Sequence, residues 1–273
     1  MLICTLGDVL LDVIVRLEQP FARADDARAT TRAGAGGQAA NVAAWAVELG
    51  AAARVVAKLG DDEGALVAAR ELGARGVELL GPKVEGRGGV VVSIVDPDGE
   101  RSMLSDRGVS PTLRAEELDV TWFRGCDALH LSGYALLSRP IDEAGAKAAG
   151  AVRAQGGLIS VDLSSATAIR DFGPERFLAR LAHLEPDVAF AGEEELDALG
   201  DAPPARTLVV KHGASGFTVV DDEGSRQTHL AREVQVLDTT GAGDALAAGF
   251  LVGGAELALE AAARCVSKVG ATP

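Results

Sequence analysis

Cysteine is scarce in this sequence, which contains only Cys4, Cys126 and Cys265 among its 273 residues. The three lie far apart in apolar surroundings and their number is odd, so the pattern favours neither a disulfide framework nor a metal-binding knuckle. We expect buried thiols that pack as small apolar side chains.

The histidines show no metal-ligand spacing and form no Ser-His-Asp or Cys-His pattern, so we interpret all four as structural. They are His130, His183, His212 and His229.

Positive charge is also scarce. Lysine and arginine number 26 against 40 acidic residues, which gives a formal net charge of −14. Such a surface repels nucleic acid and anionic membranes, so we expect neither as a partner. A nucleotide is not excluded, because a few N–H groups and one lysine act at short range, where the net charge matters little.

Long hydrophobic runs are missing as well. The apolar N-terminus is interrupted by Asp8 and Asp12, and no basic segment precedes it. No other stretch reaches the roughly 20 uncharged apolar residues that a membrane-spanning helix needs. We therefore expect a cytoplasmic protein.

The residues that are present describe a soluble globular protein, with 48% hydrophobic and 24% charged residues. Short β-rich runs such as LICTL, LISVDL and RTLVVKHG alternate with Ala-rich helical patterns such as GQAANVAAWAVELG. This alternation is typical of βαβ units and predicts an α/β fold, with a largely parallel sheet covered by helices on both faces. The length favours one such domain over residues 1–273 rather than two equal domains.

Two stretches, residues 10–35 and 86–108, break this alternation because they contain short strands and no helical period. We expect them to come together as a small antiparallel flap, or lid, at the edge of the sheet where α/β proteins usually bind ligands. Exposed flap strands offer an edge for pairing with another chain. A homodimer through the lid is therefore a further hypothesis.

The most informative segment is VQVLDTTGAGDALAAGFLVGG, residues 234–254. The small residues Gly241, Ala242 and Gly243 follow a β-rich run, and a helical pattern begins at Asp244. Unpaired N–H groups at such a helix start bind anions, and the helix dipole adds partial positive charge. Asp244 then has two interpretations: a first-turn acid favoured by the dipole, or a base that deprotonates an attacking hydroxyl beside a bound phosphoryl group.

A family resemblance favours the second interpretation. The segment DTTGAGDALAAGFL resembles the C-terminal signature of the ribokinase-like (PfkB) carbohydrate kinases, and GAGGQAANVAAWAVELGA, residues 34–51, resembles their N-terminal signature. Two long signatures in this order are far more specific than one glycine motif. The resemblance implies a three-layer ribokinase-like fold with a mostly parallel central sheet and a small β-strand lid. It also implies ATP and Mg²⁺ as cofactors, and a monovalent cation such as K⁺ near Asp238.

The same resemblance implies the sugar-binding residues. Gly36, Gly37 and Asn41, together with Asp12 after the first strand, match positions that contact sugar hydroxyls in the family. Their chemistry suits this role, because glycine lets a backbone approach closely and amides and carboxylates accept hydroxyl donors. Taken alone, Gly-Gly before a helix is equally an ordinary loop, and Asn41 is equally a capping residue.

On the nucleotide side, VVKHGASGFTVV resembles the segment that borders the ATP phosphates, with Lys211, Gly213 and Gly216 at the matching positions. Lys211 is suited to a phosphate, although a strand-end lysine is often just solvated. Asp162, the last polar residue of LISVDL, falls where the family has a polar residue near the phosphates.

The sequence also departs from the family pattern. Glu195 matches the final acid of an N-x-x-E motif that orders magnesium through water, but Gly192 replaces its Asn. The segment HLSGY lacks a glutamate that often contacts ribose, so Ser132, Gly133 or Tyr134 faces the sugar instead. The sequence ends at KVGATP, where the family usually has one further short segment, which predicts an adenine pocket trimmed on one side.

We therefore expect an ATP-dependent kinase that transfers the γ-phosphoryl group to a hydroxyl of a sugar or sugar-like substrate, with Asp244 as the general base. The flap residues Arg101 and Arg107 suit a carboxylate or phosphate on that substrate, or form ordinary surface pairs. One alternative is a nucleoside kinase of the same fold, although Phe21 is the only aromatic residue of the flap that could stack on a base.

A non-catalytic sugar-binding protein is a second alternative, which the presence of Asp244 in a G-A-G turn argues against. An NAD-dependent oxidoreductase is disfavoured, because no G-x-G-x-x-G opens the first βα unit.

Overall fold

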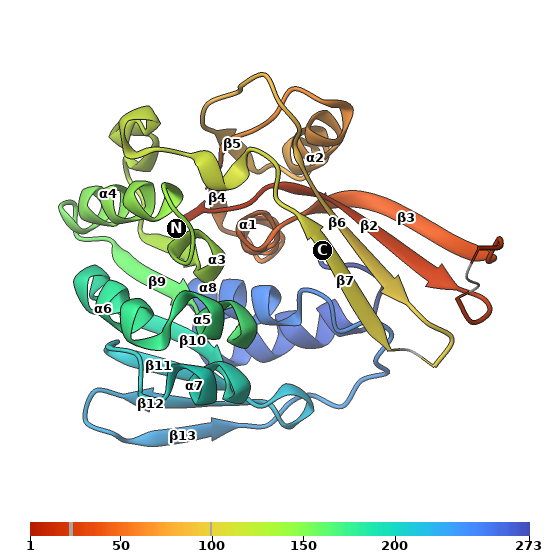
Figure 1. The fold of residues 1–273 in the computed structure, drawn as a ribbon. Helices are drawn as coiled ribbons and strands as arrows, with labels where there is room; N and C mark the ends of the chain where they lie inside the picture. The colour runs from red at the N-terminus through yellow and green to blue at the C-terminus, as the bar shows by residue number, and fades with distance from the viewer. Residues whose placement is uncertain (22–23, 99) are drawn as a thin grey trace.

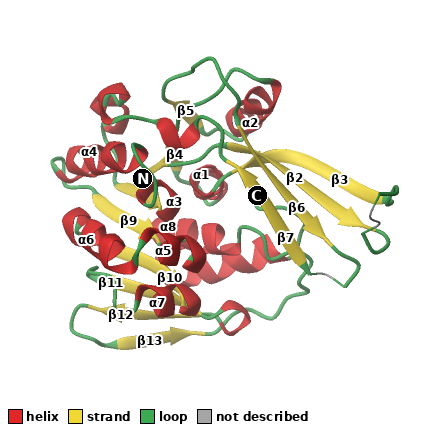
Figure 2. Ribbon diagram, viewed as in Figure 1, coloured by secondary structure: helices red, strands yellow, loops and turns green. Residues whose placement is uncertain are grey.

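The computed structural model describes residues 1–21, 24–98 and 100–273, and its strands form two sheets (Figures 1 and 2). Residues 22–23 and 99, which fall inside the two predicted lid segments, lie outside the described residues. The large sheet contains nine strands. Their spatial order is β13 (Arg226–His229), β12 (Phe217–Asp221), β11 (Thr207–Lys211), β10 (Val188–Gly192), β9 (Leu158–Asp162), β8 (Ala128–Ser132), β1 (Leu2–Leu6), β4 (Ala52–Val56) and β5 (Glu78–Leu80).

The strands from β11 to β5 in this order are all parallel, whereas β12 and β13 continue the sheet as antiparallel strands. The central strands β1, β8 and β10 are mostly apolar and are buried on both faces, because helices cover both sides. Four of the five residues of β1 and all five of β8 are buried. The largely parallel sheet predicted from the βαβ rhythm is confirmed.

The helices form a layer on each face of this sheet, so the molecule has three layers (Figure 2). One face carries α4 to α7, and its core includes Phe177 and Ile141. The other face carries α1, α2 and α8, with Trp45 and Phe190 in its core. The helices are α1 (Gln38–Glu48), α2 (Glu63–Ala74), α3 (Gly133–Leu136), α4 (Ile141–Arg153), α5 (Ala166–Phe172), α6 (Pro174–Leu184), α7 (Glu193–Leu199) and α8 (Ala242–Val266).

The small sheet projects beyond α8 (Figure 1) and has the order β3 (Ala29–Gly36), β2 (Leu10–Leu17), β6 (Gly89–Val95) and β7 (Arg101–Asp106). The expectation of a purely antiparallel flap is wrong in one respect, because its central pair, β2 and β6, is parallel. The two hairpins come from separate insertions, and each hairpin is antiparallel within itself. We call these four strands the lid sheet.

Helix α8 begins at Ala242, two residues before the start expected from the sequence. Gly241 makes this earlier start accessible, since its φ of 77° is a conformation that glycine adopts without strain. By length and composition alone, α8 could cross a membrane, and 44% of its most apolar window is buried inside the molecule. Its apolar residues pack against α1 and the sheet, as expected for a core helix.

The three cysteines are buried, unpaired thiols, as the sequence predicted.

Candidate active site

Three polar residues meet where β9, β10 and β11 end, because parallel strands finish at the same edge of a sheet. Asp162 ends β9, Glu195 lies in the first turn of α7 after β10, and Lys211 ends β11. Lys211 Nζ lies 2.8 Å from Asp162 Oδ2 and 3.8 Å from Glu195 Oε2. The residues that the sequence assigned to phosphate and metal are therefore brought together in space.

Lys211 stays charged in this cluster. Burial lowers its pKa, but the negative charges of Asp162 and Glu195 outweigh burial, so the pKa is raised overall. One lysine faces two carboxylates, of which Asp162 is almost fully buried. The cluster therefore has negative charge to spare for a further cation, and an ammonium group for a phosphate.

The turn at the start of α8 offers two backbone donors. The N–H of Ala242, one of the Gly241 to Asp244 amides expected to face the phosphates, already donates to Thr239 O at 3.2 Å. Within the described ranges, no oxygen accepts a hydrogen bond from the N–H groups of Gly243 or Asp244. A Cβ atom at Gly241 would lie 2.6 Å from the Ala271 side chain, so this turn requires glycine. Two unpaired N–H groups at a helix start form an anion site.

The Asp244 carboxyl lies inside this site rather than on the helix surface. Burial raises its pKa to about 7, and the nearby charge of Asp162 acts in the same direction. Asn41 Nδ2 donates a hydrogen bond of 2.7 Å to Asp244 Oδ2 and opposes this shift. Asn41, predicted to bind sugar, therefore also holds the acid. A carboxyl that titrates near neutral pH is suited to accept a proton.

Sequence reasoning missed Gln38 and Ser164, which connect the two halves of the site. Ser164 Oγ donates to Gln38 Oε1 at 2.5 Å, and Ser164 N donates to Asp162 Oδ1 at 2.8 Å. The Gln38 amide in turn lies against Asp244 and lowers the pKa of that acid. Ser164 has a φ of 71°, which is unusual for a residue with a side chain and frequent at functional sites. Gln38 lies within the segment GAGGQAANVAAWAVELGA and could have been found there, whereas no motif signals Ser164.

The predicted sugar residues lie where the lid sheet joins α1. Asp12 is on β2, Gly36 ends β3, and Gly37 precedes α1. A Cβ atom at Gly36 would lie 2.6 Å from Asp12 Cβ, and one at Gly37 would lie 2.4 Å from Asp8 O. Both glycines are therefore required by close packing, and Gly37 also by its φ of 97°.

Asp12 and Asn41 carry unsatisfied acceptors at this junction. Asp12 Oδ1 and Asn41 Oδ1 are buried and have no hydrogen-bond partner among the described residues. Burial and the negative charge of Asp238 raise the pKa of Asp12 to about 6. Buried acceptors without donors are costly unless a ligand pairs with them. Hydroxyl groups of a polyol are suitable donors.

Tyr134 is the residue of the HLSGY segment that faces this site. The pKa of its phenol is raised by burial, and the charges of Asp244 and Glu195 add to the shift. Ser132 is fully buried, and a Cβ at Gly133 would lie 2.5 Å from the Leu163 carbonyl oxygen.

The flap residue Arg107 forms a buried ion pair rather than one on the surface, because its guanidinium donates to both carboxylate oxygens of the buried Asp8 at 2.8 and 2.9 Å.

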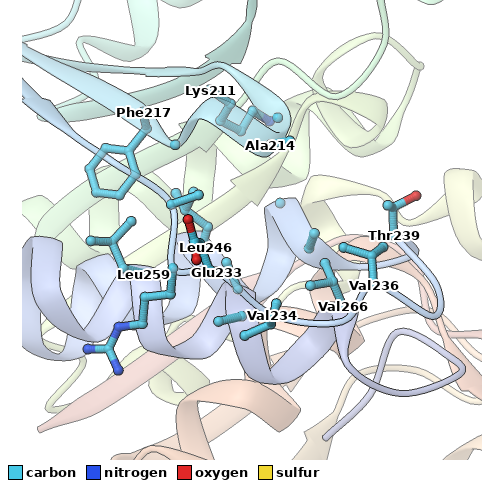
Figure 3. Close-up of a pocket in the computed structure, with 18 residues that line it drawn as sticks. Lys211, Ala214, Phe217, Glu233, Val234, Val236, Thr239, Leu246, Leu259 and Val266 are labelled. Atoms are coloured by element: carbon cyan, nitrogen blue, oxygen red, sulfur yellow. The ribbon is translucent and has the colours of Figure 1, made fainter.

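An apolar cavity of about 370 Å³ opens beside the anion site. Figure 3 shows the residues that line it. Lys211, Gly213, Gly216 and Gly243 line it, so three of the four predicted nucleotide residues border it, whereas Asp162 lies behind Lys211. Most of the remaining wall is aliphatic, from Val234, Val236, Leu246, Leu259, Ala262 and Val266. Residues 231–236 have no regular secondary structure, so no periodicity in the sequence revealed this wall. The cavity is suited to an aromatic base.

A part-buried acid at an anion-binding turn, next to Lys211 with its two carboxylates and an apolar cavity, is the arrangement that a phosphotransferase site for a small molecule requires. The model of the pfkB family carbohydrate kinases matches residues 1–272, and the chain belongs to this family.

The most informative curated relative is the ATP-dependent ribose-1-phosphate kinase of Halopiger xanaduensis, which is 35% identical over 95% of this chain and 88% of its own length. The adenosine kinase of Sinorhizobium meliloti has the same fold, with a TM-score of 0.89 at 24% identity over 99% of this chain and 95% of its own. A protein named as a ribokinase II from E. coli, solved with ATP and Mg²⁺, gives a TM-score of 0.80 at 23% identity, covering 98% and 94% of the two chains.

These matches confirm the predicted family and the ribokinase-like fold. They also confirm the predicted enzyme class, a sugar-type kinase that uses an alcohol group as acceptor.

Proposed function

We propose that the protein transfers the γ-phosphoryl group of ATP to a hydroxyl group of a sugar or sugar phosphate, with Asp244 as the general base. The observation that carries this proposal is the part-buried Asp244 carboxyl, with its raised pKa, beside the unpaired N–H groups of Gly243 and Asp244. A base and an anion site within one helical turn can act on the two partners of the same transfer. Release of ADP that depends on an added acceptor tests the proposal.

In the proposed reaction, Asp244 takes the proton from the acceptor hydroxyl as its oxygen attacks the γ-phosphorus and the bond to the ADP oxygen breaks. The two N–H groups and Lys211 face the phosphate oxygens and stabilise their charge. Gln38 and Asn41 hold the carboxylate in place. The base of ATP occupies the cavity lined by Val234, Val236 and Leu259.

Mg²⁺ fits this site in a limited role. The described residues contain no group of three or more His, Cys, Asp or Glu side chains that could hold a metal. Mg²⁺ that arrives with nucleotide phosphates needs only one or two carboxylates, since it keeps several waters. Glu195 Oε2 accepts from Gly192 N, which leaves Oε1 for such a water. When bound, the ion neutralises phosphate charge.

The acceptor sits between Asp12, Asn41 and Tyr134 in this proposal, under the lid sheet. The name of the Halopiger relative supports ribose 1-phosphate as an acceptor to be tested beside free pentoses, hexoses and nucleosides.

Buried free thiols fit a reducing compartment, which supports the cytoplasm as the location of the protein. The exposed Met103 and Leu104 on edge strand β7 support a homodimer through the lid, which sedimentation velocity would test.

The activity should rise with pH. Because the pKa of Asp244 is raised to about 7, its basic form is scarce below that pH, and kcat/KM should fall about tenfold per unit there. Above about pH 7 the profile should be flat. The folded protein favours protonated Asp244 more than the unfolded chain does. The contribution of this group to the free energy of unfolding is therefore full below pH 3.8, the ordinary pKa of an aspartate, and is lost as the pH rises through about 7. A kcat/KM that is flat from pH 5 to 8 would contradict the base assignment.

Asp12→Asn should weaken acceptor binding selectively. The substitution removes a charged acceptor with a buried, unpaired oxygen, and a hydrogen bond to such a group is worth roughly 1.5 to 3 kcal/mol. We expect the KM of the acceptor to rise at least about tenfold, with the KM of ATP within about twofold. Asp98→Asn, an exposed lid residue, is the matched control. Equal increases in both KM values would show that the acceptor site is misplaced.

A further inference from the structure

The oxygens that flank the start of α8 are already paired with the protein's own donors. Asp238 Oδ1 accepts from the N–H and hydroxyl of Thr240 at 2.9 and 2.5 Å, and Asp238 Oδ2 accepts from Gly270 N at 3.0 Å. These hydrogen bonds outweigh burial and keep the pKa of Asp238 low. The Asp238 side chain is only 8% exposed. A carboxylate in this state has little room for another ligand.

Arg101 approaches Asp238 from the lid sheet. This residue begins β7, and its Nη1 lies 3.7 Å from Asp238 Oδ1. The same Nη1 donates to the hydroxyl of Thr240, which in turn donates to Asp238. The positive charge of Arg101 also opposes the rise in the pKa of the nearby Asp12. The guanidinium therefore lies where one cation would face Asp238.

Two more lid arginines occupy the neighbouring carbonyl oxygens. Arg16 Nη2 on β2 donates to Leu237 O at 3.0 Å, and Arg32 Nη1 on β3 donates to Val269 O at 2.8 Å. The thiol of Cys265 donates to Thr240 O at 3.3 Å. A monovalent cation replaces its hydration shell with such carboxylate and carbonyl oxygens. Here these oxygens are paired with hydrogen-bond donors, and the K⁺ expected near Asp238 does not fit.

We infer that Arg101 supplies the positive charge beside Asp238 that a monovalent cation would otherwise supply, and that it is a positioning residue for the anion-binding turn. Arg101 is on the lid sheet, whereas Asp238 and Thr240 lead directly into Gly241 and α8. This contact therefore connects the lid sheet, which covers the acceptor, with the turn whose N–H groups face the phosphate. It makes turnover independent of monovalent cations and dependent on Arg101.

The first test is a cation exchange on the full-length protein. This inference rests on the proposed kinase function, so ADP release is measured with an acceptor that the panel identifies, in potassium, sodium or choline chloride at equal ionic strength. The expected kcat values agree within about twofold, and K⁺ produces no shift in melting temperature relative to choline. Activation by K⁺ of more than fivefold would overturn the inference while leaving the kinase function intact. Absence of ADP release with every acceptor would instead contradict the kinase function.

The second test replaces the charge. Arg101→Met should lower kcat at least about tenfold in choline chloride. In potassium chloride, the kcat of this variant should be at least about threefold higher than in choline chloride. Arg87→Met is the matched control, because Arg87 is a lid arginine whose pair with Asp106 at 3.3 Å is exposed to solvent. It should turn over like the parent in every salt. An Arg101→Met protein that behaves like this control, or that is equally slow in potassium and choline, would overturn the inference.

Discussion

Replacement of Asp244 by Asn should lower kcat by roughly 10² to 10⁴, the range of general-base catalysis. The amide keeps the shape of the side chain and the start of α8 but cannot accept the proton of the acceptor hydroxyl. The substitution also removes a part-buried carboxyl whose pKa is already raised to about 7, so folding should not suffer. Steady-state kinetics with saturating ATP and acceptor measure the effect, and isothermal titration measures ATP binding, which should stay within about threefold.

The matched control for this variant is Glu63→Gln. Glu63 is the first-turn acid of α2, and it interacts with a helix dipole but with no proposed substrate. Loss of a dipole interaction changes stability by about 0.3 to 1 kcal/mol and leaves turnover unchanged. If Asp244→Asn and Glu63→Gln turn over alike, Asp244 is a capping acid and the base assignment is wrong.

Replacement of Lys211 by Met should lower kcat by roughly 10² to 10³, the effect of removing one charged donor from a transferring group. The same change leaves the buried Asp162 without its partner at 2.8 Å. Removing one member of a buried pair costs about 3 kcal/mol of unfolding free energy or more. Lys83→Met, at an exposed lysine, should leave both quantities unchanged. Thermal melting and kinetics measured on the same preparation separate the two effects.

A double variant distinguishes these two roles of Lys211. Asp162→Asn in the Lys211→Met background removes the unpaired charge, so the melting temperature should recover. Turnover should remain low, because the neutral amide introduced by Asp162→Asn supplies no cation to the phosphates. Recovery of turnover together with stability would mean that Lys211 acts only by neutralising Asp162.

Much of the fold follows from local patterns in the sequence. Strands such as Leu2–Leu6 and helices such as Gln38–Glu48 are predicted by apolar periodicity and by the turns between them, and both are observed. The turn before Asp244 is equally local, since Gly241 and the first turn of α8 are adjacent in the chain. The residues that end parallel strands lie together because those strands run in the same direction.

The contacts between distant segments could not be predicted in this way. Asn41 and Asp244 are 203 residues apart, and only the packing of α1 against α8 brings them into contact. The link from Gln38 to Ser164 and the pairing of Arg101 with Asp238 are also side-chain contacts between separate elements. No periodicity records which partner a polar side chain meets across a fold. The parallel pairing of β2 with β6 depends on two insertions in the same way.

The transfer of the γ-phosphoryl group itself is measured most directly by supplying ATP labelled at that group with an acceptor panel and separating the products. The panel comprises pentoses, hexoses, sugar acids, nucleosides and ribose 1-phosphate. The account predicts that the label moves to one class of sugar or sugar phosphate, at a rate that depends on acceptor concentration and is lost in Asp244→Asn. Label that appears only in inorganic phosphate, at a rate unaffected by every acceptor, would contradict the account.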